Sequence, residues 1–165
     1  AHGLTPPAFA PQFQHTQAHI TSVEDTYLSG PDVIADVETI SLSDYIQLCT
    51  AEAEKIIKRL FSFTLVFTPI NYMSMFADAF RHYPGYAELK GDFINNEIEK
   101  TKKVLENAIT SGEIRSDINT SLIATNFFSI NMGLAGNLVR NNSIDESITL
   151  LKEQNFEFYK LLKKQ

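Results

Sequence analysis

The sequence predicts an all-α fold, a helical bundle of about six helices. From residue 41 onward, apolar residues recur three and four positions apart, which is the periodicity of one face of a helix. No segment of convincing length alternates apolar and polar residues in the way that a half-buried strand does. With 165 residues, 44% of them hydrophobic and 21% charged, the chain suits one soluble domain with a sizeable core.

We expect an irregular N-terminal arm, residues 1–41, followed by a helical domain, residues 42–165. Three of the six prolines fall within residues 1–12, which favours extended chain. Residues 13–28 are compatible with a short helix that ends at Ser29-Gly30-Pro31, whereas residues 32–40 are ambiguous. Because the chain begins with Ala1 rather than Met, we expect it to be a processed or truncated piece of a longer protein.

The first helices of the domain carry local start and stop signals. Ser41, with Asp44 three residues later, indicates a helix start, and Thr68-Pro69 indicates the next one. Pro84-Gly85 ends that second helix, and a long amphipathic helix is predicted from about Tyr86 to Thr110.

The joint that follows, AITSGEIRSDIN, has structural rather than catalytic features. Gly112 lies where a helix closes with a left-handed residue. We expect Ile114 and Ile118 to point inward over the turn, and one of Asp117, Asn119 and Thr120 to cap the next helix.

The last two predicted helices differ in charge. Residues 120–141 form a nearly uncharged helix with Arg140 only at its end, and a helix that is apolar on most sides should be buried on most sides. Its small residues favour close approach of another backbone, either in a dimer or in tight packing within one monomer. Ser143 and Glu146 form a capping box that starts the last helix.

Several classes of function lack support in the residues. A net charge of −6 disfavours nucleic-acid binding by this segment alone, and no run of about 18 apolar residues predicts a membrane span. His15 and His19 share a helical spacing but have no clear third ligand, so no metal is expected. No nucleophile elbow, phosphate-binding loop or metal triad is present, so we expect neither an enzyme nor a cofactor. Cys49 lies in an apolar stretch and is interpreted as a core residue.

Four segments, in their order, resemble the C-terminal regulatory domain of TetR/AcrR-type transcriptional regulators. The stretch Phe76-Ala-Asp-Ala-Phe-Arg-His-Tyr-Pro84 looks like that family's "EA-x-R-x-P" helix end, and SGEIRSDIN looks like its "GxLRxDxD" joint. The long helix from Glu88 and the final pair, an apolar and an amphipathic helix, complete the resemblance over about residues 42–165. The family's N-terminal helix-turn-helix has no counterpart in residues 1–41, and we favour its removal over a regulatory-type domain that works alone.

The resemblance implies a cytoplasmic homodimer in which the last two helices of each copy form a four-helix bundle. It also implies that the domain binds a small, apolar effector and reaches DNA only through the missing N-terminal domain. The candidate effector contacts are Phe61, Phe63, Phe67, Tyr72, Met75, Phe76, Phe80, Phe93, Asn126, Phe127 and Asn131. The candidate dimer contacts are Phe128, Ser129, Met132, Gly133, Gly136, Ile148, Leu151 and Phe158. For each aromatic residue, plain core packing is the alternative. For the chain as a whole, the alternative is a free-standing helical interaction module, exported and matured at Ala1.

Overall fold

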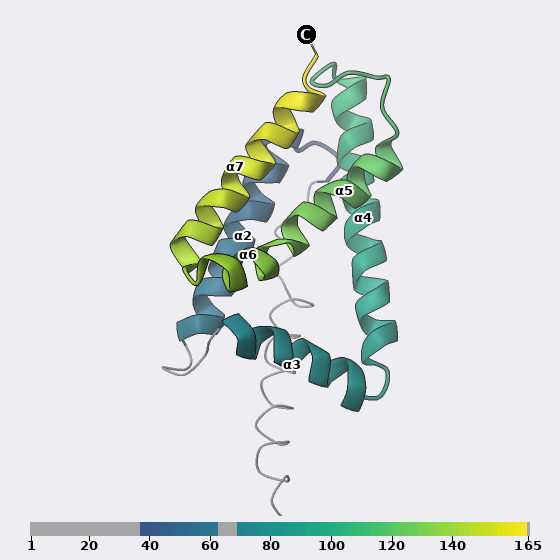
Figure 1. Cartoon of the computed structure of the whole chain (residues 1–165). Helices are drawn as coiled ribbons and strands as arrows, with labels where there is room; N and C mark the ends of the chain where they lie inside the picture. Colours follow the sequence, from purple (N-terminus) through teal and green to yellow (C-terminus); the bar gives the residue numbers. More distant parts are fainter. Residues whose placement is uncertain (1–36, 63–68, 165) are drawn as a thin grey trace, which may run out of the picture.

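The computed structural model describes residues 37–62 and 69–164 (Figure 1). These residues form helices α2 (Leu42–Ser62), α3 (Pro69–His82), α4 (Tyr86–Thr110), α5 (Thr120–Met132), α6 (Leu134–Asn141) and α7 (Ile144–Leu162). The all-α class is therefore confirmed over the described ranges, where the extended pairing is limited to an isolated bridge between Ile114 and Lys163. Of the predicted arm, residues 1–36 lie outside the description, and so does the helix expected at 13–28.

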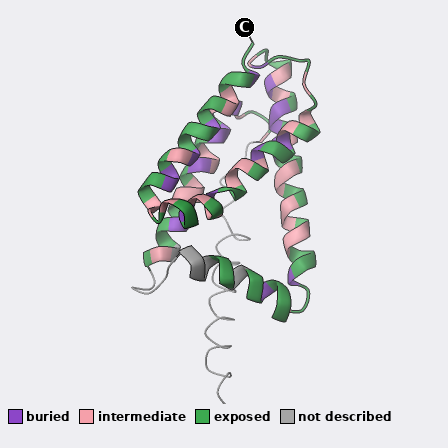
Figure 2. Ribbon diagram, viewed as in Figure 1, coloured by how far each residue is buried: buried purple, intermediate pink, exposed green. Residues whose placement is uncertain are grey.

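The helices are arranged around α2 and α7, which pack along each other (Figure 1). In this view α2, α3 and α4 form three sides of a triangle, and α5, followed by α6, crosses in front of it. The α5 helix packs on α4, whereas α6 packs against α7 and α3. Figure 2 shows buried residues concentrated where α2, α5, α7 and the C-terminal part of α4 meet, while the described residues of α3 and the N-terminal part of α4 are largely exposed or half-buried.

The interior consists mainly of two hydrophobic clusters. The α4 cluster joins α2, α4, α5, α7 and the joint after α4, and it contains Leu42, Tyr45, Ile46, Val104, Leu105, Ala108, Ile114, Ala124, Phe127 and Leu162. The α6 cluster lies nearer the other end of α2 and contains Ile57, Leu134, Leu138, Ile148 and Leu151. Because α2 and α7 contribute to both clusters, their packing connects the two ends of the core.

Local capping signals fix most helix ends where the sequence predicts them. The Ser41 hydroxyl accepts a hydrogen bond of 3.0 Å from the Asp44 N–H, and the Ser143 hydroxyl accepts one of 3.3 Å from the Glu146 N–H. Asn119, one of the three residues predicted as possible caps, caps α5 by accepting a hydrogen bond from the Leu122 N–H. Satisfying these otherwise unpaired N–H groups favours the observed starts.

The joint after α4 ties three helix ends together. Gly112 has φ +78, the left-handed conformation that glycine adopts without strain, and Ile114 is buried as expected. The Glu113 carboxylate accepts hydrogen bonds from the N–H groups of Leu42 and Ser43 at the start of α2 and from the Tyr159 hydroxyl on α7. The joint therefore supplies the cap of a helix that begins 71 positions earlier.

The helix predicted over residues 120–141 is instead divided into α5 and α6 at Gly133. The Gly133 N–H donates to both Ser129 O and Ile130 O, which tightens the backbone at this point. A Cβ at position 133 would lie 3.0 Å from Ile130 O, closer than such contacts normally come. The absence of a side chain thus permits the break, and α6 continues in a new direction toward α3 and α7.

Candidate functional site

The outer face of α5 and α6 is an uncharged surface that residues 37–62 and 69–164 leave exposed. We call it the α5–α6 face and define it by exposed residues at three- and four-residue spacing: Leu122, Thr125, Asn126, Ser129, Met132, Gly133, Gly136 and Val139. Residues 120–139 include no charged side chain. Leu122 and Met132 are 58% and 48% exposed, so water contacts large apolar groups here.

Five of the predicted dimer contacts belong to this face or its edge. Ser129, Met132, Gly133 and Gly136 are exposed, and Phe128 is half-buried. A Cβ on Gly136 would meet no atom within 4 Å, so packing among the described residues does not explain the small residue at this position.

The other three predicted dimer contacts are placed differently. Ile148 and Leu151 are buried in the α6 cluster, and Phe158 packs partly buried against the α4 cluster, with its ring centroid 6.0 Å from that of Phe127. The assignment of Ile148 and Leu151 to a dimer surface is therefore wrong for this arrangement, because their face of α7 is covered by the chain's own α2 and α6. A helical stripe shows that a face is buried, but not by which chain.

The described residues among the effector candidates do not lie together around a single binding site. Phe61 packs against the α6 cluster, and Phe127 is buried in the α4 cluster. Phe80 is 53% exposed, with its ring edge-on to Tyr86 at 5.0 Å, and half-buried Phe93 carries the Lys90 ammonium over its ring. Phe63 and Phe67, and the side chains of Tyr72, Met75 and Phe76 on α3, lie outside the described residues.

The two asparagines of the apolar helix have opposite positions. Asn126 is exposed, so the expectation that it contacts an effector in the interior is wrong for this arrangement. Asn131 is half-buried, donates from Nδ2 to Phe127 O at 2.8 Å, and accepts from Asn155 Nδ2 at 3.3 Å. Its partner is thus another side chain of the same protein.

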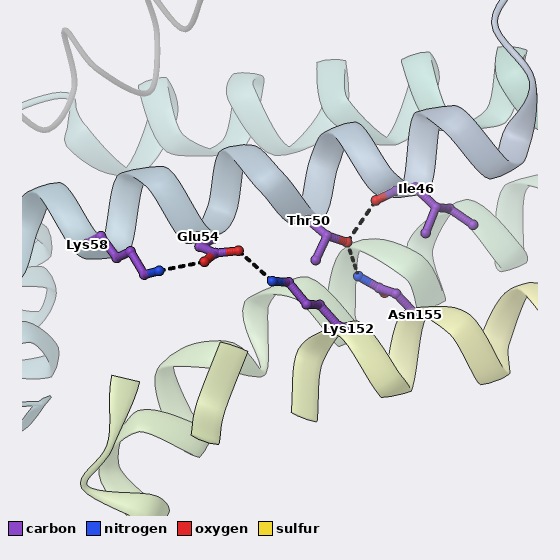
Figure 3. Close-up of polar contacts among 6 residues, drawn as sticks. All are labelled: Ile46, Thr50, Glu54, Lys58, Lys152 and Asn155. Atoms are coloured by element: carbon purple, nitrogen blue, oxygen red, sulfur yellow. Dashed lines mark hydrogen bonds and ion pairs between the residues drawn. The ribbon is translucent and has the colours of Figure 1, made fainter. Parts of the chain in front are cut away.

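Asn155 belongs to a buried group that the sequence did not reveal, which we call the polar layer: Thr50, Asn131 and Asn155. These residues come from α2, α5 and α7, and the layer lies between the α4 and α6 clusters. Asn155 Nδ2 donates to Thr50 Oγ1 at 2.9 Å, and the Thr50 hydroxyl donates to Ile46 O at 2.7 Å (Figure 3). Asn155 is 1% exposed, yet its Oδ1 has no hydrogen-bond partner.

An ion pair lies one helical turn from the polar layer on both helices (Figure 3). Glu54 on α2 accepts from Lys152 on α7 at 2.7 Å and from Lys58, on its own helix, at 2.6 Å. Hydrogen bonds from these two ammonium groups, first that of Lys152, lower the pKa of the Glu54 carboxyl to about 2. The carboxylate is therefore charged and compensated at neutral pH.

A second buried polar contact joins α2 to α4. The Tyr45 hydroxyl and the Thr101 hydroxyl are 2.8 Å apart, and desolvation by burial raises the pKa of Tyr45. Burial also raises the pKa of the nearby Cys49 thiol to about 12, which keeps it a neutral thiol and supports the interpretation of Cys49 as a core residue. Within the described residues, no group of three or more potential metal ligands gathers.

Comparison with known proteins leaves the family open. No family model, no curated protein and no solved structure matches the chain. By length and composition alone, Thr120–Asn141 is long and apolar enough to cross a membrane, contrary to the expectation that no segment is. Core helices of soluble proteins meet the same criterion, so this is weak evidence for a span.

Proposed function

We propose that this chain is the effector-binding and dimerisation domain of a TetR-like transcriptional regulator, whose DNA-binding part lies outside the sequence. The observation that carries the proposal is the exposed, uncharged α5–α6 face. It lies on α5 and α6, which together correspond to the penultimate predicted helix, one of the two helices where the resemblance predicts contact between two copies.

The chemistry of the face supports a second copy of the chain as its occupant. Burial of exposed Leu122, Met132 and Val139 would remove apolar area from water, which is the main driving force of association. Because residues 120–139 are uncharged, a two-fold contact of this face with itself would bring no like charges together. Small residues such as Ser129 and Gly136 would let two helix backbones approach closely.

The division of the core supports control by an effector. A ligand shifts a protein between two arrangements only by binding one of them more tightly. Here α2 and α7 connect two separate clusters across a polar layer, so a ligand that binds between these helices would change the position of one end of the domain relative to the other. In a dimer, that displacement would alter the spacing of the DNA-binding parts and hence the affinity for DNA.

Sedimentation equilibrium of the purified chain tests the dimer. We expect a dimer at micromolar concentration and a shift toward monomer in Met132→Glu, because the variant would bury a charge in the contact. Asn96→Glu, which adds the same charge at an exposed position of α4, is the control and should stay dimeric. A wild-type monomer at these concentrations would contradict the dimer.

The effector and the DNA-binding part need separate tests. Native mass spectrometry of the purified protein should detect a co-purified small molecule of apolar character. A helix-turn-helix encoded directly upstream of Ala1 would support the regulator, whereas a cleavable signal peptide there would favour an exported interaction module instead.

A further inference from the structure

The hydrogen bonds of the polar layer leave one buried acceptor, Asn155 Oδ1, without a donor. The Thr50 hydroxyl donates to Ile46 O, Asn131 Nδ2 donates to Phe127 O, and Asn155 Nδ2 donates to both Thr50 Oγ1 and Asn131 Oδ1. Asn155 Oδ1 is left without a partner although the residue is 1% exposed. Leaving such a group buried and unpaired is unfavourable, so native proteins rarely do so.

Rotating the Asn155 amide by half a turn does not pair all the polar atoms of the layer. Its Oδ1 would then face Asn131 Oδ1, and two acceptors would meet. Turning Asn131 as well would withdraw its Nδ2 from Phe127 O, and the Thr50 hydroxyl would have to give up Ile46 O to reach Asn155. With the side chains arranged as the structure has them, the partner of Asn155 Oδ1 is a donor from outside the three side chains.

The surroundings select an uncharged donor. The hydrophobic clusters lie on both sides of the layer, and an unpaired cation between them would lose its hydration without gaining a counter-charge. The Glu54 carboxylate, one turn from Thr50 on α2, is already paired with Lys58 and Lys152. Asn131 is half-buried, so one edge of the layer approaches the protein surface beside α5.

We propose that Asn155 Oδ1 is the polar anchor of a binding site for a small, neutral molecule that donates a hydrogen bond from a hydroxyl group and places its apolar body between α2, α5 and α7. This inference rests on the proposed function, because it names the chemistry of the effector and the residue that selects it. It also moves the expected site from the aromatic residues of α3 and α4 to the layer between the two clusters.

Cyclohexanol and cyclohexanone are suitable probes because they are similar in size, while only the alcohol donates a hydrogen bond. We expect the wild-type chain to bind cyclohexanol about tenfold more tightly than cyclohexanone, the effect of one buried hydrogen bond. The Asn155→Leu variant should lose this preference, and the control Asn96→Leu, altered at an exposed position of α4, should keep it.

A measurement on the unmodified protein covers the case in which Asn155→Leu does not fold. In an NMR titration, the Asn155 side-chain amide resonances should shift with cyclohexanol and stay in place with cyclohexanone. Three results would each overturn the proposal. They are equal affinities for cyclohexanol and cyclohexanone, no binding of cyclohexanol up to its solubility limit, and a water bound to Asn155 that saturating cyclohexanol does not displace. A dimer with a co-purified effector but no alcohol preference would remove only this inference, whereas a monomer without effector would remove the proposed function itself.

Discussion

The carboxylate of Glu113 accepts a hydrogen bond of 2.9 Å from the backbone N–H of Leu42, so the joint after α4 caps the start of α2. The same side chain accepts from the Ser43 N–H and from the Tyr159 hydroxyl, both at 3.0 Å. Burial and the hydrogen bond to Glu113 raise the pKa of Tyr159. One residue thus connects the ends of α2, α4 and α7.

Replacing Glu113 by Ala should destabilise the domain by about 1–2 kcal/mol, because two N–H groups of α2 lose their acceptor. Urea denaturation followed by circular dichroism measures the change. Glu106→Ala is the control, since this exposed residue of α4 has no side-chain hydrogen bond or ion pair among the contacts described, and it should change stability by less than about 0.5 kcal/mol. Equal effects of the two substitutions would show that the cap contributes nothing.

The Gly136→Ala variant distinguishes an effect on folding of the single chain from an effect on dimer formation. A Cβ at this position meets no atom within 4 Å, and Ala in a helix is favoured over Gly by up to about 1 kcal/mol, so folding of the chain should not suffer. If a second copy approaches at Gly136, the added methyl group should raise the dimer dissociation constant about tenfold or more. Sedimentation equilibrium measures this constant.

Gly91→Ala is the matched control for that experiment. Gly91 also lies within a helix, α4, and also has open space where a methyl group would lie, but it is far in sequence from the α5–α6 face. It should favour folding in the same way and leave association unchanged. A dimer equally strong in both variants would place the contact elsewhere on the protein.

Glu54→Gln should affect stability only above acidic pH. The folded-state pKa of Glu54, about 2, is below the ordinary value of 4.5. The contribution of its pairing is therefore complete above pH 4.5 and is lost as the pH falls toward 2. We expect the variant to be less stable than wild type by under about 1 kcal/mol at pH 7, and the difference to shrink below pH 4.5.

Thermal unfolding of both proteins between pH 2.5 and 7 measures that difference. Glu52→Gln is the comparison, because Glu52 pairs at 3.5 Å with Lys55 on the same helix and does not connect α2 to α7. A Glu54→Gln deficit that is constant over this range would argue against the ion pair as its source.

Cys49 should react slowly with thiol reagents while the protein is folded. Its pKa of about 12, compared with 9.0 for an ordinary thiol, reduces the thiolate fraction at pH 8 by about a thousandfold. Iodoacetamide alkylation in buffer and in 6–8 M urea, roughly the range that unfolds small proteins, should show this contrast by mass spectrometry. Similar rates in the two solutions would exclude a buried, neutral thiol.

Helix ends could be predicted from the sequence because their causes are local. Ser41, Pro69 and Ser143 each act within one turn of the helix that they start, and the predicted boundaries of α4 agree with the structure. Gly112 could be assigned for the same reason, since a left-handed residue after a helix depends only on its neighbours.

The polar layer could not be predicted, because its members act through tertiary packing. Asn155 is 105 positions from Thr50 and 24 from Asn131, and nothing in their flanking sequences distinguishes them from exposed polar residues. The sequence pattern also does not say whether an apolar helix face is buried by its own chain or by a second copy. For this reason Ile148 could be assigned to a dimer contact although it is buried within the monomer.

The joint also determines when, during synthesis, the domain can be completed. The first turn of α2 leaves the ribosome 71 residues before Glu113, the residue that satisfies its N–H groups. Within the same joint, the Arg115 N–H donates to Leu162 O at the end of α7. In a nascent chain, the Leu42 and Ser43 N–H groups therefore lack this acceptor until the joint emerges, and the joint itself is not closed until α7 has been made. Folding of this domain should consequently be a late event, and chains terminated before Leu162 are expected to be targets for proteolysis.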